Sequence, residues 1–124
     1  MQTSTVLFVD DDVISNLEFC AHLREFGFNV IEAYSAREAF KVIDSQARLT
    51  ALVSDINLGA GGSGLDVARR ARAAHPGLPV VFISGMTTIR HLTDRITGST
   101  LIAKPLHPRQ IVDALCGVIS RQAA

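Results

Sequence analysis

The feature that most constrains the fold of this chain is a regular alternation of short apolar runs with segments of helical periodicity. Five runs are continuous, apolar and rich in β-branched residues, and they occupy residues 6–9, 30–31, 51–56, 80–83 and 101–103. A continuous apolar run predicts a strand that is buried on both faces, because a half-exposed strand alternates polar with apolar side chains. The sequence therefore predicts five buried β-strands.

After each run, apolar residues recur three or four positions apart, which is the spacing of one face of an α-helix. The five stripes are Val13, Leu17, Cys20 and Leu23; Ala36, Phe40, Ile43 and Ala47; Val67, Ala68, Ala71 and Ala74; Ile89, Leu92 and Ile96; and Ile111, Leu115 and Val118. Ser35 and Glu38 predict a capping box at the start of the second helix. Gly27 and Gly98 stand at predicted helix ends, and Pro108 suits a first helical turn. The fourth stripe is rich in threonine, so we expect that helix to be short or mobile.

This order of strand and helix, repeated five times, predicts parallel strands joined by right-handed helical crossovers. The fold class is therefore α/β, a flavodoxin-like doubly wound (βα)5 sandwich with a five-stranded parallel sheet in the order 2-1-3-4-5. A chain of 124 residues, 48% of them hydrophobic, can bury a core of its own. We therefore expect residues 1–124 to form a single domain.

Composition excludes several classes of function. Twelve basic and twelve acidic residues give a net charge of zero, which argues against direct binding of nucleic acid. No apolar run is long enough to span a bilayer and no signal sequence opens the chain, so we expect a cytoplasmic protein without a membrane contact. The two cysteines, Cys20 and Cys116, are expected to be buried thiols. The four histidines have no spacing typical of a metal site.

Polar residues follow four of the five predicted strands. Asp10, Asp11 and Asp12 follow the first strand, Asp55 ends the third, Ser84 follows the fourth and Lys104 follows the fifth. Each has an ordinary explanation alone; Asp12, for example, is the expected N-cap of the first helix. Because ligands of such sheets bind outside the carboxyl ends of the strands, the coincidence of all four at one edge predicts a functional site.

The charges of this site indicate its chemistry. Two carboxylates about 5 Å apart repel by about 3 kcal/mol at an effective dielectric constant near 20. Asp10, Asp11 and Asp55 would face only one ammonium group, that of Lys104, so we expect a Mg²⁺ ion among them. A divalent ion beside an ammonium and the hydroxyl of Ser84 is typical of phosphoryl transfer. Asp55 is then the candidate nucleophile.

These residues stand in motifs that resemble the response-regulator receiver domain of two-component signalling, in its stand-alone, chemotaxis-receiver-like form. The motifs are LFVDDD at residues 7–12, SDINL at 54–58, FISG at 82–85 and AKP at 103–105. The resemblance covers nearly the whole chain and implies that Asp55 accepts a phosphoryl group from a histidine kinase or phosphotransfer protein.

The resemblance also implies a role for each neighbour of Asp55. Asp11 would bind Mg²⁺ directly and Asp10 chiefly through water, and the backbone carbonyl of Asn57 would complete the protein ligands. Ser84 would move toward the phosphoryl group, and Lys104 would hold one of its oxygens. The Lys104–Pro105 bond is expected to be cis.

Two departures from the family are visible. Gly59 stands where a proline is usual, within a glycine-rich segment at residues 59–64 that we interpret as a flexible loop rather than a phosphate cradle. Leu101 stands at the position of the family's switch aromatic and has neither a flat ring nor a hydroxyl. A downstream protein is expected to bind the face of the fourth helix, fifth strand and fifth helix, with Arg90, His91, Asp94 and Arg109 on it.

Two other functions stay open at this level. A small haloacid-dehalogenase-type phosphatase would use Asp10 as nucleophile and Asp12 as acid, but it would leave Asp55 without a role. A receiver fold that is not phosphorylated would be a binding module. With no output domain after residue 124, the output would be protein binding or onward phosphotransfer, unless the chain is part of a hybrid kinase or larger regulator.

Overall fold

The computed structural model describes residues 4–45, 47–85 and 98–123. All five predicted strands are present, within two residues of their predicted ends: β1 (Thr5–Val9), β2 (Asn29–Ala33), β3 (Ala51–Asp55), β4 (Val80–Ser84) and β5 (Thr100–Ala103). All pairs are parallel and the order is β2-β1-β3-β4-β5. The predicted fold class and strand order are confirmed.

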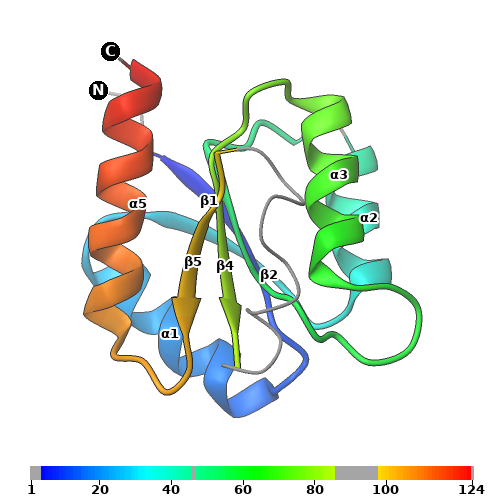
Figure 1. Cartoon of the computed structure of the whole chain (residues 1–124), viewed down its shortest axis with the longest axis horizontal. Helices are drawn as coiled ribbons and strands as arrows, with labels where there is room; N and C mark the ends of the chain where they lie inside the picture. The colour runs from blue at the N-terminus through cyan, green and yellow to red at the C-terminus, as the bar shows by residue number, and fades with distance from the viewer. Residues whose placement is uncertain (1–3, 46, 86–97, 124) are drawn as a thin grey trace.

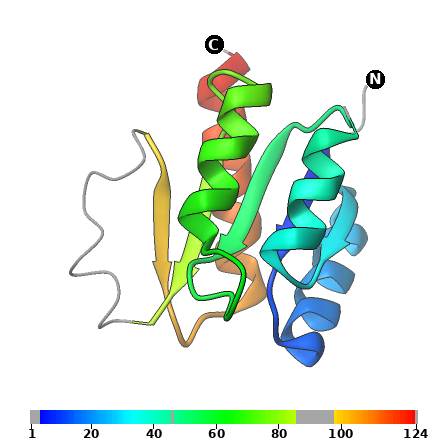
Figure 2. The same cartoon turned by 90° about the vertical axis from the view of Figure 1, so that its right-hand side faces the viewer.

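Helices cover both faces of the sheet, as Figures 1 and 2 show. Helices α1 (Val13–Glu25) and α5 (Pro108–Ala123) pack on one face, and α2 (Ala36–Asp44) and α3 (Gly64–Ala74) on the other. The predicted fourth helix, including Ile89, Leu92 and Ile96, lies outside the described residues.

Alternate residues of each strand enter two separate cores. In β1, Leu7 and Val9 face the core under α2 and α3, whereas Val6 and Phe8 face the core under α1 and α5. All four side chains are fully buried. Because successive strand residues point to opposite faces, a sheet covered on both sides needs apolar residues at every position. This explains the continuous apolar runs.

The predicted buried face of α1 is wrong over its first two turns. Val13 and Leu17 are 55% and 51% exposed, whereas Asn16, Cys20 and Leu23 are buried. The reason is that the Asn16 side chain bonds to buried backbone carbonyls, so a polar residue takes the inward position. Two further residues of the predicted apolar stripes are not buried helix residues. Ala47 lies beyond the end of α2, and Ala74 is exposed at the end of α3.

The helix ends largely follow the sequence. Asp12 is the N-cap of α1, Pro108 is the first residue of α5, and Gly27 follows α1 with a positive φ of 110°. Ser35 caps α2 as predicted, but the Glu38 carboxylate accepts from the backbone N–H of Tyr34 instead of Ser35.

The helix α3 begins with a complete capping box that the sequence analysis missed. The Ser63 hydroxyl accepts from the backbone N–H of Asp66, and the Asp66 carboxylate accepts from the backbone N–H of Ser63. Of the two cysteines, Cys20 is buried as predicted, but Cys116 is exposed on α5, which corrects the prediction of two buried thiols. Over the described ranges, every helix is too short or too polar to traverse a bilayer.

Candidate functional site

The three predicted carboxylates meet at the carboxyl edge of the sheet. Asp55 is the last residue of β3, and Asp10 and Asp11 directly follow β1, the neighbouring strand. Each of the three carboxylates offers an oxygen, and these oxygens lie within 4.8 Å of one another. Asp10 and Asp55 are buried, at 1% and 5% exposure, and Asp11 is exposed. The site is therefore a buried acidic pocket with one carboxylate at its mouth.

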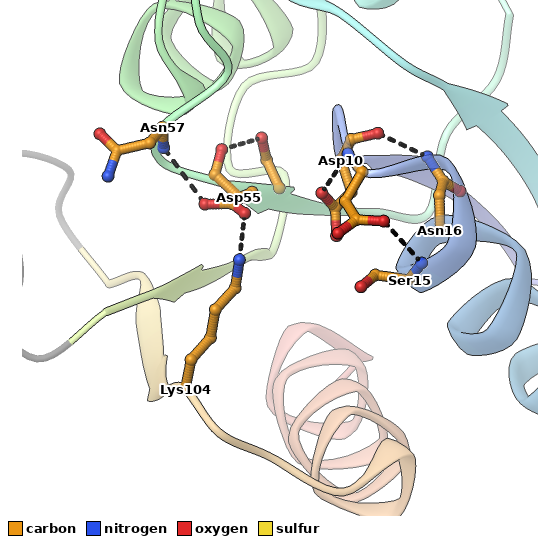
Figure 3. A network of polar contacts seen from close by, with 8 residues as sticks. Asp10, Ser15, Asn16, Asp55, Asn57 and Lys104 are labelled. Atoms are coloured by element: carbon orange, nitrogen blue, oxygen red, sulfur yellow. Dashed lines mark hydrogen bonds and ion pairs between the residues drawn. The ribbon is translucent and has the colours of Figure 1, made fainter.

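Lys104 is paired with one of the two buried carboxylates of this pocket, that of Asp55. Its Nζ lies 2.5 Å from Oδ2 of Asp55, whose Oδ1 accepts a hydrogen bond of 3.2 Å from the backbone N–H of Asn57, as Figure 3 shows. The Lys104–Pro105 peptide bond is cis, as the resemblance implied. Both Asp55 oxygens thus have a donor, and Asn57 lies at an exposed position beside the pocket.

Backbone hydrogen bonds continue past the strand ends and join the residues of the site. The N–H of Ile56 donates to the carbonyl of Ile83 over 3.1 Å, and the N–H of Lys104 donates to the carbonyl of Ser84 over 2.8 Å. Backbone hydrogen bonds therefore hold β3, β4 and β5 together as far as the residues of the site, Asp55, Ser84 and Lys104.

Two buried oxygen atoms of the site have no hydrogen-bond partner within the described part of the chain. They are Oγ of Ser84, the last residue of β4, and Oδ2 of Asp10. A buried polar atom without a hydrogen-bond partner destabilises the folded state. In native proteins, water, an ion or a ligand usually supplies the missing partner. Oδ2 of Asp10 can accept a cation, and Ser84 can donate to an oxygen that enters the pocket.

The electrostatics of the pocket agree with this assignment. Burial is the main cause that raises the pKa of the Asp10 carboxyl, and the charges of Asp55 and Asp11 raise it further. Burial alone would lower the pKa of the Lys104 ammonium, but its hydrogen bond to Asp55 and the nearby carboxylates raise it. The pocket therefore favours added positive charge, and its carboxylate oxygens are the ligands that Mg²⁺ prefers.

The glycine-rich segment at residues 59–64 approaches the pocket at its two ends, with Gly59 near the Asp11 carboxylate and Gly64, the first residue of α3, against the backbone of Asp55. Gly59, Gly61 and Gly62 have backbone φ values of 75°, 97° and 136°, which residues other than glycine rarely adopt. A Cβ atom on Gly64 would lie 2.2 Å from the carbonyl oxygen of Asp55. The glycine at position 64 thus lets α3 begin against the backbone of the central acidic residue.

The side chain of Asp12 caps the helix α1. Its Oδ1 accepts hydrogen bonds of 3.1 and 3.2 Å from the backbone N–H groups of Ile14 and Ser15, the second of which is drawn in Figure 3. These bonds give Asp12 the structural role of an N-cap at the start of α1. This observation argues against the phosphatase hypothesis, which needs Asp12 as a proton donor.

The expected docking face is only partly described. Arg90, His91 and Asp94 lie outside the described residues. Arg109 is exposed, but its guanidinium lies 5.5 Å from the ring centroid of Phe26, the residue after α1, which places it on the α1 side of α5 and corrects its assignment to that face. Leu101 is partly buried against the core under α2 and α3.

Comparison with known proteins identifies the family. The model of the response regulator receiver domain matches residues 6–116. This chain belongs to that family. Receiver domains are typically not enzymes, and they act in two-component signalling with histidine kinases as partners in general. The acidic cluster of Asp10, Asp11 and Asp55 is typical of the Mg²⁺ site of receivers.

Individual relatives agree with this assignment. The probable transcriptional regulatory protein TcrX of Mycobacterium tuberculosis is 31% identical over 97% of this chain and 51% of its own length. The regulatory protein VanR of Enterococcus faecium is 30% identical over 86% of this chain and 46% of its own length. A crystal structure of a receiver protein from Sinorhizobium medicae matches with a TM-score of 0.89 at 29% identity, covering 96% of both chains. The chain spans about half the length of the curated relatives it matches.

The raised pKa of Asp10 leads to a prediction about stability without metal. An Asp10→Asn variant should unfold about 4 °C higher than the wild type in EDTA at pH 7.5, a gain of about 1 kcal/mol, because the neutral amide removes a buried charge and keeps the acceptor for the Asp12 N–H. The unfolded Asp10 ionises near pH 3.9, so wild-type stability falls as pH rises from there through the higher folded pKa.

Thermal unfolding followed by circular dichroism at pH 4 and pH 7.5 measures this effect. The advantage of Asp10→Asn should be smaller at pH 4, because the raised pKa of Asp10 leaves more of the folded wild type protonated there. Excess Mg²⁺ at pH 7.5 should stabilise the wild type more than the variant. A variant that is less stable than the wild type at both pH values would contradict the prediction.

Proposed function

We propose that this chain is a phospho-accepting receiver in which Asp55 takes a phosphoryl group and thereby switches the binding of a partner protein. The observation that carries the proposal is the pairing of the buried Asp55 carboxylate with Lys104 inside a cluster of three carboxylates. A nucleophilic carboxylate beside an ammonium group, with room for a divalent cation, meets the requirements for forming an acyl phosphate.

The reaction transfers a phosphoryl group between two nucleophiles. The phosphorus–nitrogen bond of a phosphohistidine on the donor breaks, and a bond forms between phosphorus and a carboxylate oxygen of Asp55. The imidazole leaves with the electron pair of the broken bond and is protonated from solvent. Lys104 neutralises one phosphoryl oxygen in the transition state, and the unpartnered Ser84 hydroxyl donates a hydrogen bond to another.

Mg²⁺ fits the same pocket as an added cation. In the proposal Asp10, Asp11, Asp55 and the backbone carbonyl of Asn57 hold it, and the unpartnered Oδ2 of Asp10 supports this assignment. When bound, the ion neutralises the charge that builds on the phosphoryl oxygens. The three carboxylates would hold the ion, and burial of Asp10 and Asp55 limits the access of water to them.

The partners follow from the family. We propose a sensor histidine kinase or a phosphotransfer protein as the donor, acting in the cytoplasm. We also propose a downstream protein that binds the expected face of the fourth helix, β5 and α5, of which the structure describes β5 and α5. We further propose that residues 1–124 act as one receiver domain, since elements from both halves of the described chain share each core.

The test is to identify the residue that acquires the phosphoryl group. The purified chain is incubated with acetyl phosphate and Mg²⁺, its intact mass is measured, and the labelled carboxylate is located by peptide mapping after borohydride reduction. The proposal expects one phosphoryl group on Asp55 and none when EDTA replaces Mg²⁺. Label on Asp10 would instead support the phosphatase, and no label with any phosphodonor would leave the binding module.

A further inference from the structure

A buried amide holds the turn that carries two of the acidic residues. Asn16 lies on the inward face of α1 and is fully buried. Its Nδ2 donates hydrogen bonds of 3.0 Å to the backbone carbonyl of Asp10 and 3.0 Å to that of Ala33, and the first of these is drawn in Figure 3. Ala33 ends β2 and Asp10 directly follows β1, so both carbonyls lie where the ladder between these strands stops.

The strand pair alone cannot satisfy both of these carbonyls. The N–H of Asp10 donates to the carbonyl of Ala33 over 3.1 Å, which is the last backbone bond of the β1–β2 pair. The Asp10 carbonyl lies one peptide further, where the chain turns toward α1. Asn16 supplies its donor, so the turn is held by a side chain of the helix that it leads into.

The amide itself has one possible orientation. Its Oδ1 accepts a hydrogen bond from the thiol of Cys20, one helical turn later, over 3.1 Å. Burial raises the pKa of this thiol to about 12, so it stays protonated and donates. With a thiol donor on one side and two carbonyl acceptors on the other, every hydrogen-bonding group of the Asn16 side chain is directed.

Fixing the Asp10 carbonyl also fixes the next residue. The peptide group is planar, so the direction of the Asp10 carbonyl sets the positions of the nitrogen and Cα of Asp11. The Asp10 carboxylate is held from the other side, because its Oδ1 accepts from the backbone N–H of Asp12 over 3.0 Å. The directions of both acidic side chains therefore depend on a turn that Asn16 holds.

We propose that Asn16 is a positioning residue of the metal pocket, holding the turn of residues 10–12 so that Asp10 and Asp11 present their carboxylates beside Asp55. This inference rests on the proposed function, since it assumes that the pocket binds a divalent cation. Groups that orient metal ligands without touching the metal change metal affinity by about 10- to 100-fold when they are removed.

The test compares metal affinity in variants whose stability is matched. Asn16→Ala should bind Mn²⁺, used as the probe ion and followed by electron paramagnetic resonance, about tenfold more weakly than the wild type. Asn16→Ser keeps one donor and should lose about threefold; it carries the comparison if Asn16→Ala does not fold. Val118→Ala in the second half of α5 removes buried apolar volume far along the chain from the turn and should keep wild-type affinity.

The possible results separate the two proposals. A wild-type chain that binds Mn²⁺ and is phosphorylated, with folded Asn16 variants that bind the ion within twofold of wild type, would overturn the role of Asn16 and leave the proposed function intact. Equal losses in Asn16→Ala and Val118→Ala would also overturn it, because general destabilisation would explain both. A wild-type chain that binds no Mn²⁺ would overturn the proposed function and the role of Asn16 together.

Discussion

An Asp55→Ala chain should be phosphorylated by acetyl phosphate and Mg²⁺ at least about 1000-fold more slowly than the wild type. The variant lacks the only carboxylate that is both buried in the cluster and paired with Lys104 among the described residues. Asp10 and Asp11 remain, but within the described ranges no ammonium group is bonded to them to neutralise an incoming phosphoryl oxygen. Intact-mass measurement over a time course gives the rates.

The matched control for this variant is Asp12→Asn. Asp12 stands next to the pocket, and its Oδ1 caps α1 through Ile14 and Ser15. Asparagine caps a helix as well as aspartate does, so this variant removes a neighbouring charge without unfolding the turn. It should be phosphorylated at a rate within about threefold of the wild type. Phosphorylation of Asp55→Ala at the rate of Asp12→Asn would show that another residue accepts the group.

Of the proposed substitutions, Gly64→Ala should cause the largest loss in the free energy of unfolding. The added Cβ would lie 2.2 Å from the carbonyl oxygen of Asp55 and 2.9 Å from Cα of Ile56, and both are backbone atoms that cannot rotate away. The N–H of Gly64 also donates to the Ile56 carbonyl over 2.8 Å, which ties the two segments together. We expect a loss of about 3 kcal/mol, even though alanine favours a helix by about 1 kcal/mol over glycine.

Thermal and urea unfolding measure this loss, which should lower the melting temperature by about 10 °C. Gly85→Ala is the control, because a Cβ there meets no atom of the described residues within 4 Å and the backbone has no positive φ. That variant should keep its stability within about 0.5 kcal/mol. A Gly64→Ala chain as stable as Gly85→Ala would mean that α3 moves away from β3 without loss, and that the contact is not required.

The fold could be predicted because its main signals are periodic. Parallel strands that are covered on both faces leave continuous apolar runs, and the helices between them leave stripes at intervals of three and four. The errors lie where one side chain overrides the period. Val13 and Leu17 match the apolar stripe of α1, yet both are exposed, because Asn16 takes the inward position and donates to two backbone carbonyls.

The candidate site was predictable for a topological reason. The carboxyl ends of parallel strands share one edge, so Asp10, Asp55 and Lys104 had to approach one another once the strand order was known. The role of Asn16 was not predictable, because a bond from a side chain to a distant backbone carbonyl leaves no pattern in the sequence. The exposure of Cys116 was missed for a similar reason, since it depends on how α5 is rotated against the sheet.

The backbone bonds from Ile56 to Ile83 and from Lys104 to Ser84 have a mechanical consequence. They join the carboxyl ends of β3, β4 and β5, which carry the side chains of the site, so these strand ends resist displacement relative to one another. If Asp55 is phosphorylated as we propose, the added dianion cannot be accommodated by sliding one strand past the next, because each slide would break one of these backbone hydrogen bonds. The change of shape that follows phosphorylation would then fall to described segments outside these bonds, such as residues 57–62 after β3.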